Sequence, residues 1–291
     1  QALLESWEQQ TQVNASADLT TTTFRIVARA LFGANIPRDT LTSLAAPIGQ
    51  LLTESFTRLG SLTGFKSRQF IESKRQLDEV VTSIIETRTS SPETPDLLEL
   101  IKSGDLDPNY IHHESISFLL AGNETTANAL SWMLAFLVQH PEEQERCASD
   151  PEAIDRAFHE TMRLAPPIWI VERHALGNDQ VSGYDVPKGA SITIPTYTMH
   201  RHRDFWDEPD RFNPDRFIDA DLHPAAYIPF GIGPRVCIGK EFALMEARII
   251  ASVLLPKLRF SLASDATPEP EAAITLRIKG DLHLKLEPRK A

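Results

Sequence analysis

One apolar segment, residues 108–140, limits the folds open to this chain more than any other feature. Asp107-Pro108 is a favourable helix start, and no strong helix breaker follows until His140-Pro141. The segment predicts a helix of about 32 residues, which is roughly 48 Å long at 1.5 Å per residue. Only a helix that crosses a large domain needs that length. Residues 123–126 in its middle are Asn-Glu-Thr-Thr, and because polar groups inside a membrane are costly we exclude a transmembrane helix.

The rest of the pattern predicts further helices first and short strands late in the chain. Helices are expected over 3–13, 18–33, 67–88 and 96–103, after Pro141, after Pro151 and over 238–255. Strands are expected in VERHAL, DQVSGYDVP and SITIPTYT, an irregular segment over 204–229, and a final hairpin that turns at Gly280-Asp281. We predict a mainly α fold with small β-sheets, forming one domain over 1–291, helical over about 1–165 and β-rich over about 166–291.

Composition and charge exclude several classes of protein. Asp and Glu total 40 against 29 for Lys and Arg, a formal net charge of −11, and so acidic a chain is not expected to bind nucleic acid. Only two cysteines are present, Cys147 and Cys237, which excludes a disulfide framework and a four-cysteine zinc site. We expect a cytoplasmic, reducing environment. No targeting segment follows Gln1, and an anchor upstream of residue 1 stays open.

The segment FGIGPRVCIG, from Phe230 to Gly239, carries the strongest chemical signal. A lone cysteine is most often a small buried hydrophobe, but glycines around Cys237 allow tight turns and a close approach of the backbone to a flat ligand. A helix is expected to start there, and its dipole and free N–H groups stabilise a thiolate. A thiolate in such a loop suits an axial haem ligand. With this segment the chain resembles the haem-thiolate monooxygenases, the cytochrome P450 family.

This resemblance implies a b-type haem with the Cys237 thiolate as the axial ligand of the iron. Arg173 and Arg235 could be ordinary solvated arginines, but they match family positions that pair with haem propionates, a suitable task for guanidinium groups. Phe230 resembles the family's aromatic residue near the thiolate. The other residues expected at the haem are small: Gly231, Gly239, Ala121 and Gly122. No CxxCH sequence is present, which excludes covalent c-type haem.

The middle of the central helix, Ala121 to Thr126, is a second match to the family. An acid beside an alcohol inside an apolar helix must be hydrogen-bonded or functional. One alternative is a threonine that only bonds to its own helix. The resemblance implies instead that Glu124 and Thr125 deliver protons during oxygen activation. Gly122 removes a side chain where a ligand would press against the helix.

A third match combines Glu160-Thr161-Met162-Arg163 with Pro214-Asp215-Arg216-Phe217. Glu160 and Arg163 share one helix face, and by itself that spacing would indicate an exposed pair worth roughly 0.3–0.5 kcal/mol. With the later PxRF element, the residues resemble the family's buried charge triad of Glu160, Arg163 and Arg216. The implied role is structural, because the triad would lock the irregular segment and so hold Cys237 in place.

The resemblance implies insertion of one oxygen atom of O2 into a hydrophobic organic substrate. Electrons would come from an external ferredoxin, flavodoxin or flavoprotein reductase, since no GxGxxG sequence is present. Family analogy places an apolar set of residues at the substrate: Phe118, Ile168, Trp169, Ile170, Ile274 and Thr275. Two alternatives stay open. One is a peroxide-using or isomerase-type member of the family, against which Glu124-Thr125 argues, and the other is a truncated haem-binding or structural remnant without catalysis.

The family fold is expected to be N-terminally incomplete in this chain. The matches cover about residues 108–290, and Trp7 is followed by Glu-Gln-Gln-Thr, which lacks the arginine of the family's WxxxR element. We therefore expect that element, an N-terminal sheet and a loop that caps the substrate pocket to lie upstream of residue 1. On this expectation the chain alone would bind haem weakly and aggregate.

Overall fold

The computed structural model describes residues 1–34, 67–87, 96–104, 106–219 and 222–289, together with 36, 37, 40, 44, 47–51, 53 and 54. The helices are α1 (Ala2–Trp7), α2 (Ala15–Phe32), α4 (Arg68–Thr87), α5 (Leu97–Lys102), α6 (Pro108–Gln139), α7 (Pro141–Ser149), α8 (Pro151–Leu164), α9 (Thr196–Met199) and α10 (Lys240–Leu254), with two 3-10 turns, η1 (Pro214–Phe217) and η2 (Gly233–Arg235).

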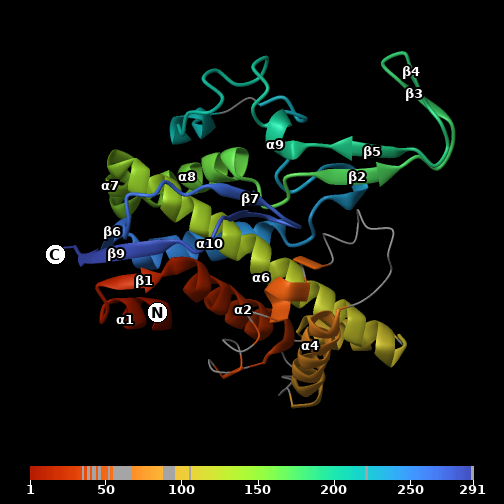
Figure 1. Ribbon diagram of the computed structural model, residues 1–291, viewed down its shortest axis with the longest axis horizontal. Coiled ribbons are helices and arrows are strands. Elements are labelled where there is room, and N and C mark those ends of the chain that lie inside the picture. Colours follow the sequence, from red (N-terminus) through yellow and green to blue (C-terminus); the bar gives the residue numbers. More distant parts are fainter. Residues whose placement is uncertain are drawn as a thin grey trace.

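The strands form small antiparallel sheets. The largest joins β1 (Gln12–Asn14), β9 (His283–Pro288) and β6 (Leu258–Leu262), with β9 in the middle. The two-stranded sheets pair β2 (Val171–His174) with β5 (Ser191–Ile194), β3 (Asp179–Val181) with β4 (Tyr184–Val186), and β7 (Pro270–Ala272) with β8 (Leu276–Ile278). The β3–β4 hairpin projects from one end of the molecule (Figure 1).

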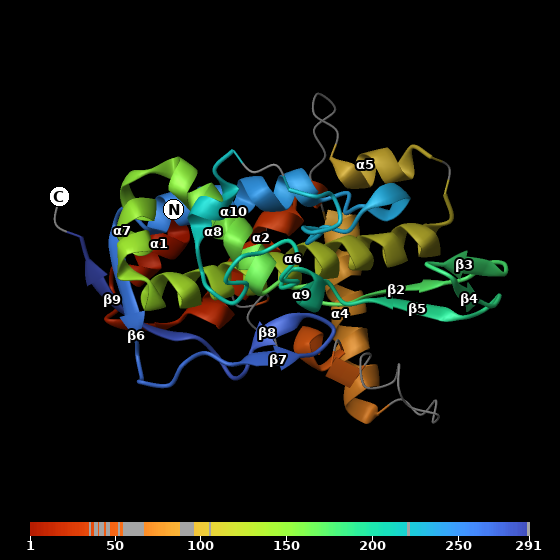
Figure 2. The ribbon, with the colours of Figure 1, turned by 90° about the horizontal axis from the view of Figure 1, so that it is seen from above.

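The central helix is confirmed as α6, which runs through the middle of the molecule in both ribbon views (Figures 1 and 2). The Asp107 side chain caps its first turn by accepting a hydrogen bond from the Asn109 N–H at 2.7 Å, and Pro108 occupies the first helical position. Residues 129–135 are buried without interruption. None of the described helices is both long enough and apolar enough to span a membrane.

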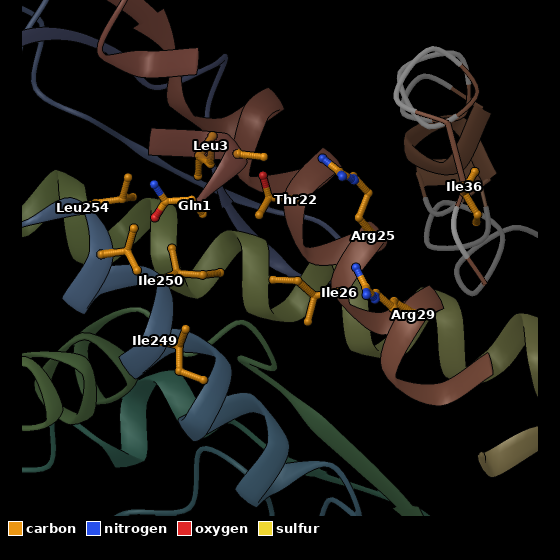
Figure 3. Close-up of a pocket in the computed structure, with 12 residues that line it drawn as sticks. Gln1, Leu3, Thr22, Arg25, Ile26, Arg29, Ile36, Ile249, Ile250 and Leu254 are labelled. Carbon is orange, nitrogen blue, oxygen red and sulfur yellow. The ribbon is translucent and has the colours of Figure 1, made fainter. Parts of the chain in front are cut away.

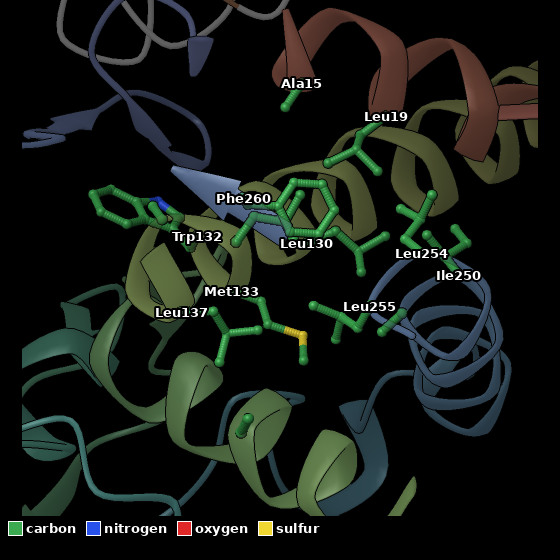
Figure 4. Close-up of a cluster of buried hydrophobic side chains, with 14 of the residues drawn as sticks. Ala15, Leu19, Leu130, Trp132, Met133, Leu137, Ile250, Leu254, Leu255 and Phe260 are labelled. Atoms are coloured by element: carbon green, nitrogen blue, oxygen red, sulfur yellow. The ribbon is translucent and has the colours of Figure 1, made fainter. Parts of the chain in front are cut away.

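The main hydrophobic core lies where α6 meets α10 and the β1–β9–β6 sheet. Leu130 and Met133 of α6 lie toward Leu254 and Leu255 at the end of α10, whereas Trp132 lies on the other side of α6 (Figure 4). Each fully buried leucine or methionine contributes about 1.5–3 kcal/mol relative to an exposed one. This packing fixes α6 and α10 against each other, and the candidate site lies on these two helices further from the sheet.

A second cluster of buried side chains joins α2, α4 and α6. Phe24, Val27 and Phe32 of α2 pack with Leu77 and Val81 of α4. Leu119 of α6 completes the contact and is also fully buried. This cluster holds α2 along one side of the central helix.

Two predictions of local structure are wrong. The helix expected over 3–13 ends at Trp7, and residues 12–14 form a strand because Val13 pairs with Leu284 across the sheet. No hairpin turns at Gly280-Asp281, because β8 pairs with β7 whereas β9 pairs with β1 and β6. The Asp281 carboxylate instead accepts a hydrogen bond from the Asn14 amide at 2.7 Å.

Boundaries of individual elements also differ from the prediction. The last helix begins at Lys240 rather than Ile238, so Cys237 precedes its first turn. The segment SITIPTYT is a strand only to Ile194, and α9 begins at Thr196, directly after Pro195. Proline favours the start of a helix and removes a donor from a strand, which explains the change at this point.

Candidate functional site

A cavity of about 770 Å³ lies between the middle of α6 and the segment that leads into α10. Cavities of roughly 300–1,000 Å³ are typical of small-molecule and cofactor sites. Most of its lining is apolar, including Val27, Leu31, Phe158 and Phe242. The sequence-predicted residues in the lining are Phe118, Ala121, Gly122, Thr125, Ile168, Arg173, Phe230, Gly231, Arg235, Cys237 and Gly239.

The cysteine loop is closed by backbone hydrogen bonds. The Cys237 N–H donates to the Phe230 carbonyl at 2.9 Å, and the loop turns through Gly231 and Gly233, whose φ angles are +74° and +75°. Residues other than glycine rarely adopt such backbone angles. A Cβ at residue 239 would lie 3.9 Å from the Cys237 sulfur, in van der Waals contact. The positive φ angles therefore account for Gly231 and Gly233, and the Cys237 thiol is exposed.

Large apolar side chains flank the exposed thiol. Ile232, Val236 and Ile238 are 54%, 50% and 88% exposed. Adjacent exposed hydrophobic residues of this size indicate a surface that another group covers. A flat apolar group seated over Cys237 would cover this loop.

Two arginines complete the chemistry of the cavity wall. Arg173 lies on β2, and its Nη1 donates to the Glu172 carbonyl at 2.8 Å. The Arg235 guanidinium makes no hydrogen bond or ion pair with any residue that the structure describes. One thiol and two cations in an apolar cavity match what an iron porphyrin with two carboxylates requires, so the residues present fit haem. The described residues contain no cluster of three or more His, Cys, Asp or Glu side chains that could hold a metal ion by itself.

Thr125 and Gly122 supply the α6 side of the cavity. The Thr125 hydroxyl donates to the Ala121 carbonyl of its own helix at 2.7 Å, which leaves its oxygen able to accept from a ligand. A Cβ on Gly122 would lie only 3.0 Å from Val27 Cγ2 of α2. Close packing of α2 against α6 therefore also favours glycine here, and the role of Gly122 beside a ligand stays a prediction.

Glu124 points away from the cavity lining. Its Oε1 accepts a hydrogen bond from the Thr275 hydroxyl at 2.6 Å, and Thr275 Oγ1 accepts one from Asn128 Nδ2 at 3.0 Å. Burial raises the pKa of Glu124, while the hydrogen bond from Thr275 and the charge of Arg277 oppose that rise. Four residues predicted at the substrate lie outside the described lining: Trp169, Ile170, Ile274 and Thr275.

The structure brings Glu160, Arg163 and Arg216 together behind the cysteine loop. The Glu160 and Arg163 side chains are fully buried and form a two-pronged pair, with Nε–Oε2 at 2.7 Å and Nη2–Oε1 at 2.8 Å. Arg216 Nε lies 3.4 Å from Glu160 Oε1, and Glu160 Oε1 also accepts from the Asn213 N–H at 2.9 Å. The isolated exposed pair considered from the sequence is therefore excluded.

Arg163 extends this cluster into the irregular segment after α9. Its Nη1 donates to the carbonyls of His200 at 2.9 Å and Pro209 at 2.6 Å, and its Nη2 to that of Arg211 at 3.2 Å. Its guanidinium also lies over the Trp206 ring, 4.9 Å from the centroid. One buried side chain thus fixes three backbone carbonyls of a segment with little regular structure.

His200 is a residue that the sequence interpretation missed. Its ring is fully buried, its Nδ1 lies 3.2 Å from the Arg163 carbonyl, and its Nε2 accepts from the Ile228 N–H at 2.9 Å. Burial lowers its pKa to about 4, so the ring is neutral and Nδ1 carries the proton. His200 therefore joins the end of α8 to Ile228, two residues before Phe230. The segment TMHRHRD contains His200 and His202, and nothing local in it distinguishes the buried one.

A second cavity, of about 300 Å³, lies between α2 and α10. Figure 3 shows Ile249 and Ile250 of α10 opposite Ile26 of α2, with Arg25 and Arg29 along the rim. None of the sequence-predicted site residues is in its described lining. The site chemistry is concentrated in the larger cavity.

Comparison with known proteins is consistent with this geometry. The family model described as Cytochrome P450 matches residues 1–284. The chain is 33% identical over 240 residues to a cytochrome P450 of Mycobacterium tuberculosis, covering 75% of this chain and 52% of that protein. It is 34% identical to cytochrome P450 4A14 of Rattus norvegicus over 66% of this chain and 42% of that one. The chain thus spans about half the length of the curated relatives it matches.

More distant and structural similarities cover nearly the whole chain. A cytokinin hydroxylase of Arabidopsis thaliana is 28% identical over 95% of this chain and 62% of its own length. The crystal structure of a mutant haem domain, cytochrome P450DA, superposes with a TM-score of 0.86 at 25% identity, covering 99% of this chain and 72% of the other.

Proposed function

This chain belongs to the cytochrome P450 family, and from that premise we propose that it is part of a haem-thiolate monooxygenase. The reaction would insert one oxygen atom of O2 into a hydrophobic organic substrate. One observation supports this best: Cys237 and Arg235 of the cysteine loop, Arg173 of β2 and Thr125 of α6, from three separate segments, line a single apolar cavity. The mainly apolar lining suits a hydrophobic substrate beside the cofactor.

In this proposal the chain holds a b-type haem through residues of the cavity wall. Cys237 would ligate the iron, Arg173 and Arg235 would bind the two propionates, and Phe230, Gly231 and Gly239 would shape the loop around the thiolate. When bound, the haem supplies dioxygen activation, which electron donation from a thiolate favours. Electrons would come from an external ferredoxin, flavodoxin or flavoprotein reductase.

Thr125 and Glu124 would handle protons on the opposite wall. The Thr125 oxygen faces the cavity and would hold a proton or water there, while Glu124, next to it in the chain, would exchange protons on the side away from the cavity. Glu124 is only partly buried and its pKa is raised by burial. A carboxyl group so tuned exchanges protons closer to neutral pH than an ordinary one.

The charge triad and His200 would act on the cysteine loop by positioning it. Glu160, Arg163 and Arg216 bind the irregular segment, and His200 connects that segment with Ile228 at the entrance to the loop. Their contribution is to keep the sulfur at one place in the cavity wall, not to contact the reacting atoms.

The experiment that tests the proposal is a difference spectrum of the reduced, carbon-monoxide-bound protein. The unchanged chain is expected to give the red-shifted Soret band of a thiolate-ligated haem, and Cys237→His is expected to abolish it. Cys147→Ala is the matched control, because burial raises the pKa of Cys147 to about 12 and keeps it a thiol. A band that survives in Cys237→His would overturn the assignment.

Two alternatives predict different results in the same protein. A peroxide-using or isomerase-type member would turn over without a reductase. A structural remnant would give no thiolate band, and a haem-binding remnant would give the band without turnover. Haem occupancy after gel filtration shows whether a haem that covers Ile232, Val236 and Ile238 is retained by this chain.

A further inference from the structure

Glu124 is the final acceptor in a series of two hydrogen bonds, from Asn128 to Thr275 and from Thr275 to Glu124. The proposed function does not require this order. Thr275, in the turn between β7 and β8, is almost completely buried and donates its hydroxyl proton to Glu124 Oε1 at 2.6 Å. Asn128, one helical turn after Glu124 on α6, donates its amide to Thr275 Oγ1 at 3.0 Å. Three side chains from two elements thus form one ordered series.

Counting donors shows why the order matters. A threonine hydroxyl has one proton, and with the Asn128 amide donating to its oxygen, that proton is directed at Glu124. Oε1 therefore accepts this hydrogen bond, and a proton bound to Oε1 would be repelled by the Thr275 hydroxyl proton. Glu124 Oε2 accepts no hydrogen bond from any described residue, so it is the oxygen that remains for proton uptake.

Thr275, and not a charged residue, makes the direct hydrogen bond to Glu124. Arg277, on β8, is the cation whose charge acts on Glu124, but its Nε is bonded to Glu271 of β7 at 2.6 Å. Between α2 and α6, the Thr23 hydroxyl donates to Asn123 Oδ1 at 2.7 Å, a contact without charge. A hydroxyl, and not an ion pair, therefore controls the carboxyl group.

We infer that Thr275, oriented by Asn128, is a positioning residue for proton delivery: it fixes Glu124 Oε1 as an acceptor and makes Oε2 the atom that gains and loses the proton. The inference rests on the proposed role of Glu124. It also assigns Thr275 a task different from the substrate contact expected from family analogy. Because the hydrogen bond favours the charged form, losing it would leave Glu124 protonated at higher pH.

The test measures Glu124 directly, without turnover. The infrared band of its protonated carboxyl group is isolated by subtracting the spectrum of Glu124→Gln, and its pKa is followed in a pH titration. Thr275→Val is expected to raise this pKa by about one unit, as the loss of one hydrogen bond to a carboxylate implies. Thr275→Ser keeps the hydroxyl and is expected to retain the original pKa.

Two further variants check the direction of the series. Asn128→Leu frees the Thr275 hydroxyl to rotate, so a smaller rise is expected; a fall in the pKa would show that Asn128 had been accepting the proton, and would overturn the inference. Thr161→Val is the matched control, a buried threonine whose hydroxyl bonds, among the described residues, to the Ala157 carbonyl of its own helix alone. It should leave Glu124 unchanged.

Catalysis by the haem-loaded protein provides the second readout. In Thr275→Val the low-pH limit of product formed per electron should move upward by the same amount as the Glu124 pKa. An unchanged pKa, or a raised pKa with an unmoved limit, overturns the inference. Product per electron that is unaffected by Glu124→Gln would instead refute the proposed role of Glu124, and the infrared result distinguishes the two failures.

Discussion

Replacing Glu246 by glutamine is expected to stabilise this protein at neutral and alkaline pH. Glu246 lies on α10 with only 3% of its surface exposed, and neither carboxyl oxygen has a hydrogen-bond partner among the residues that the structure describes. Burial without compensation raises its pKa from the ordinary 4.5 to about 8. Glutamine has nearly the same shape and cannot become charged.

The size of the effect follows from the two pKa values. The folded state binds the proton more tightly than the unfolded state, so this group's contribution is complete below pH 4.5 and is lost as the pH rises to about 8. Each pH unit in that window removes about 1.4 kcal/mol. The loss is therefore about 3 kcal/mol at pH 7 and about 5 kcal/mol above pH 8. Glu246→Gln should avoid it.

Urea unfolding from pH 4 to pH 9 measures this difference. The free energies of unfolding of the unchanged protein and Glu246→Gln should agree near pH 4 and separate progressively above it, with the variant more stable. Glu241→Gln is the control, because Glu241 is on the same helix with an 86% exposed side chain and should leave the pH dependence unchanged. Parallel curves for Glu246→Gln and the unchanged protein would refute the reasoning, since they would mean that the carboxylate is compensated.

Three other substitutions test the packing around the site. Glu160→Ala should lower the free energy of unfolding by about 3–5 kcal/mol in urea titrations, because it leaves Arg163 charged and unpaired in the interior; a loss below about 1 kcal/mol would contradict the buried triad. Gly122→Ala should cost about 1–3 kcal/mol from the clash with Val27, and adding Val27→Ala should recover part of it, whereas additive losses would exclude the contact. Buried His200 binds a proton less tightly in the folded than in the unfolded state, so the free energy of unfolding should fall by about 3 kcal/mol as the pH falls from 6.5 to about 4. His200→Gln should lack this pH dependence; an identical slope of unfolding free energy against pH would show that His200 does not cause it.

The sequence predicted those parts of the fold that local signals determine. The family resemblance and the mainly α fold class are confirmed by the match over residues 1–284 and by the TM-score of 0.86. The bounds of α6 follow from Asp107-Pro108 and Pro141, because these residues start and stop a helix through the backbone next to them. The partners of β9 could not be predicted in the same way. They depend on burying Leu284 and Leu286 against segments far away in the chain, which outweighs a Gly-Asp turn signal.

In the candidate site, too, local sequence predicts some features and contacts between distant segments determine the others. The residues of the cysteine loop meet in one cavity because they are close together in the chain. The direction of Glu124, the reason for Gly122 and the position of His200 depend on contacts with Thr275, Val27 and Ile228, which neither composition nor periodicity indicates. The haem-binding, catalytic and pocket roles, and the extent of the single domain, stay predictions.

The pairing of β1 with β9 has a consequence for how the chain folds during synthesis. Asn14 and Asp281, bonded at the edge of this sheet, are 267 residues apart. At 5–20 residues per second, translation between them takes roughly 13–50 seconds, and closing a loop of that length costs about 5 kcal/mol in chain entropy. For all that time Val13 and its neighbours have no strand to pair with. The sheet can form only when residues 283–288 leave the ribosome, so the first strand of this chain is among the last to find its place.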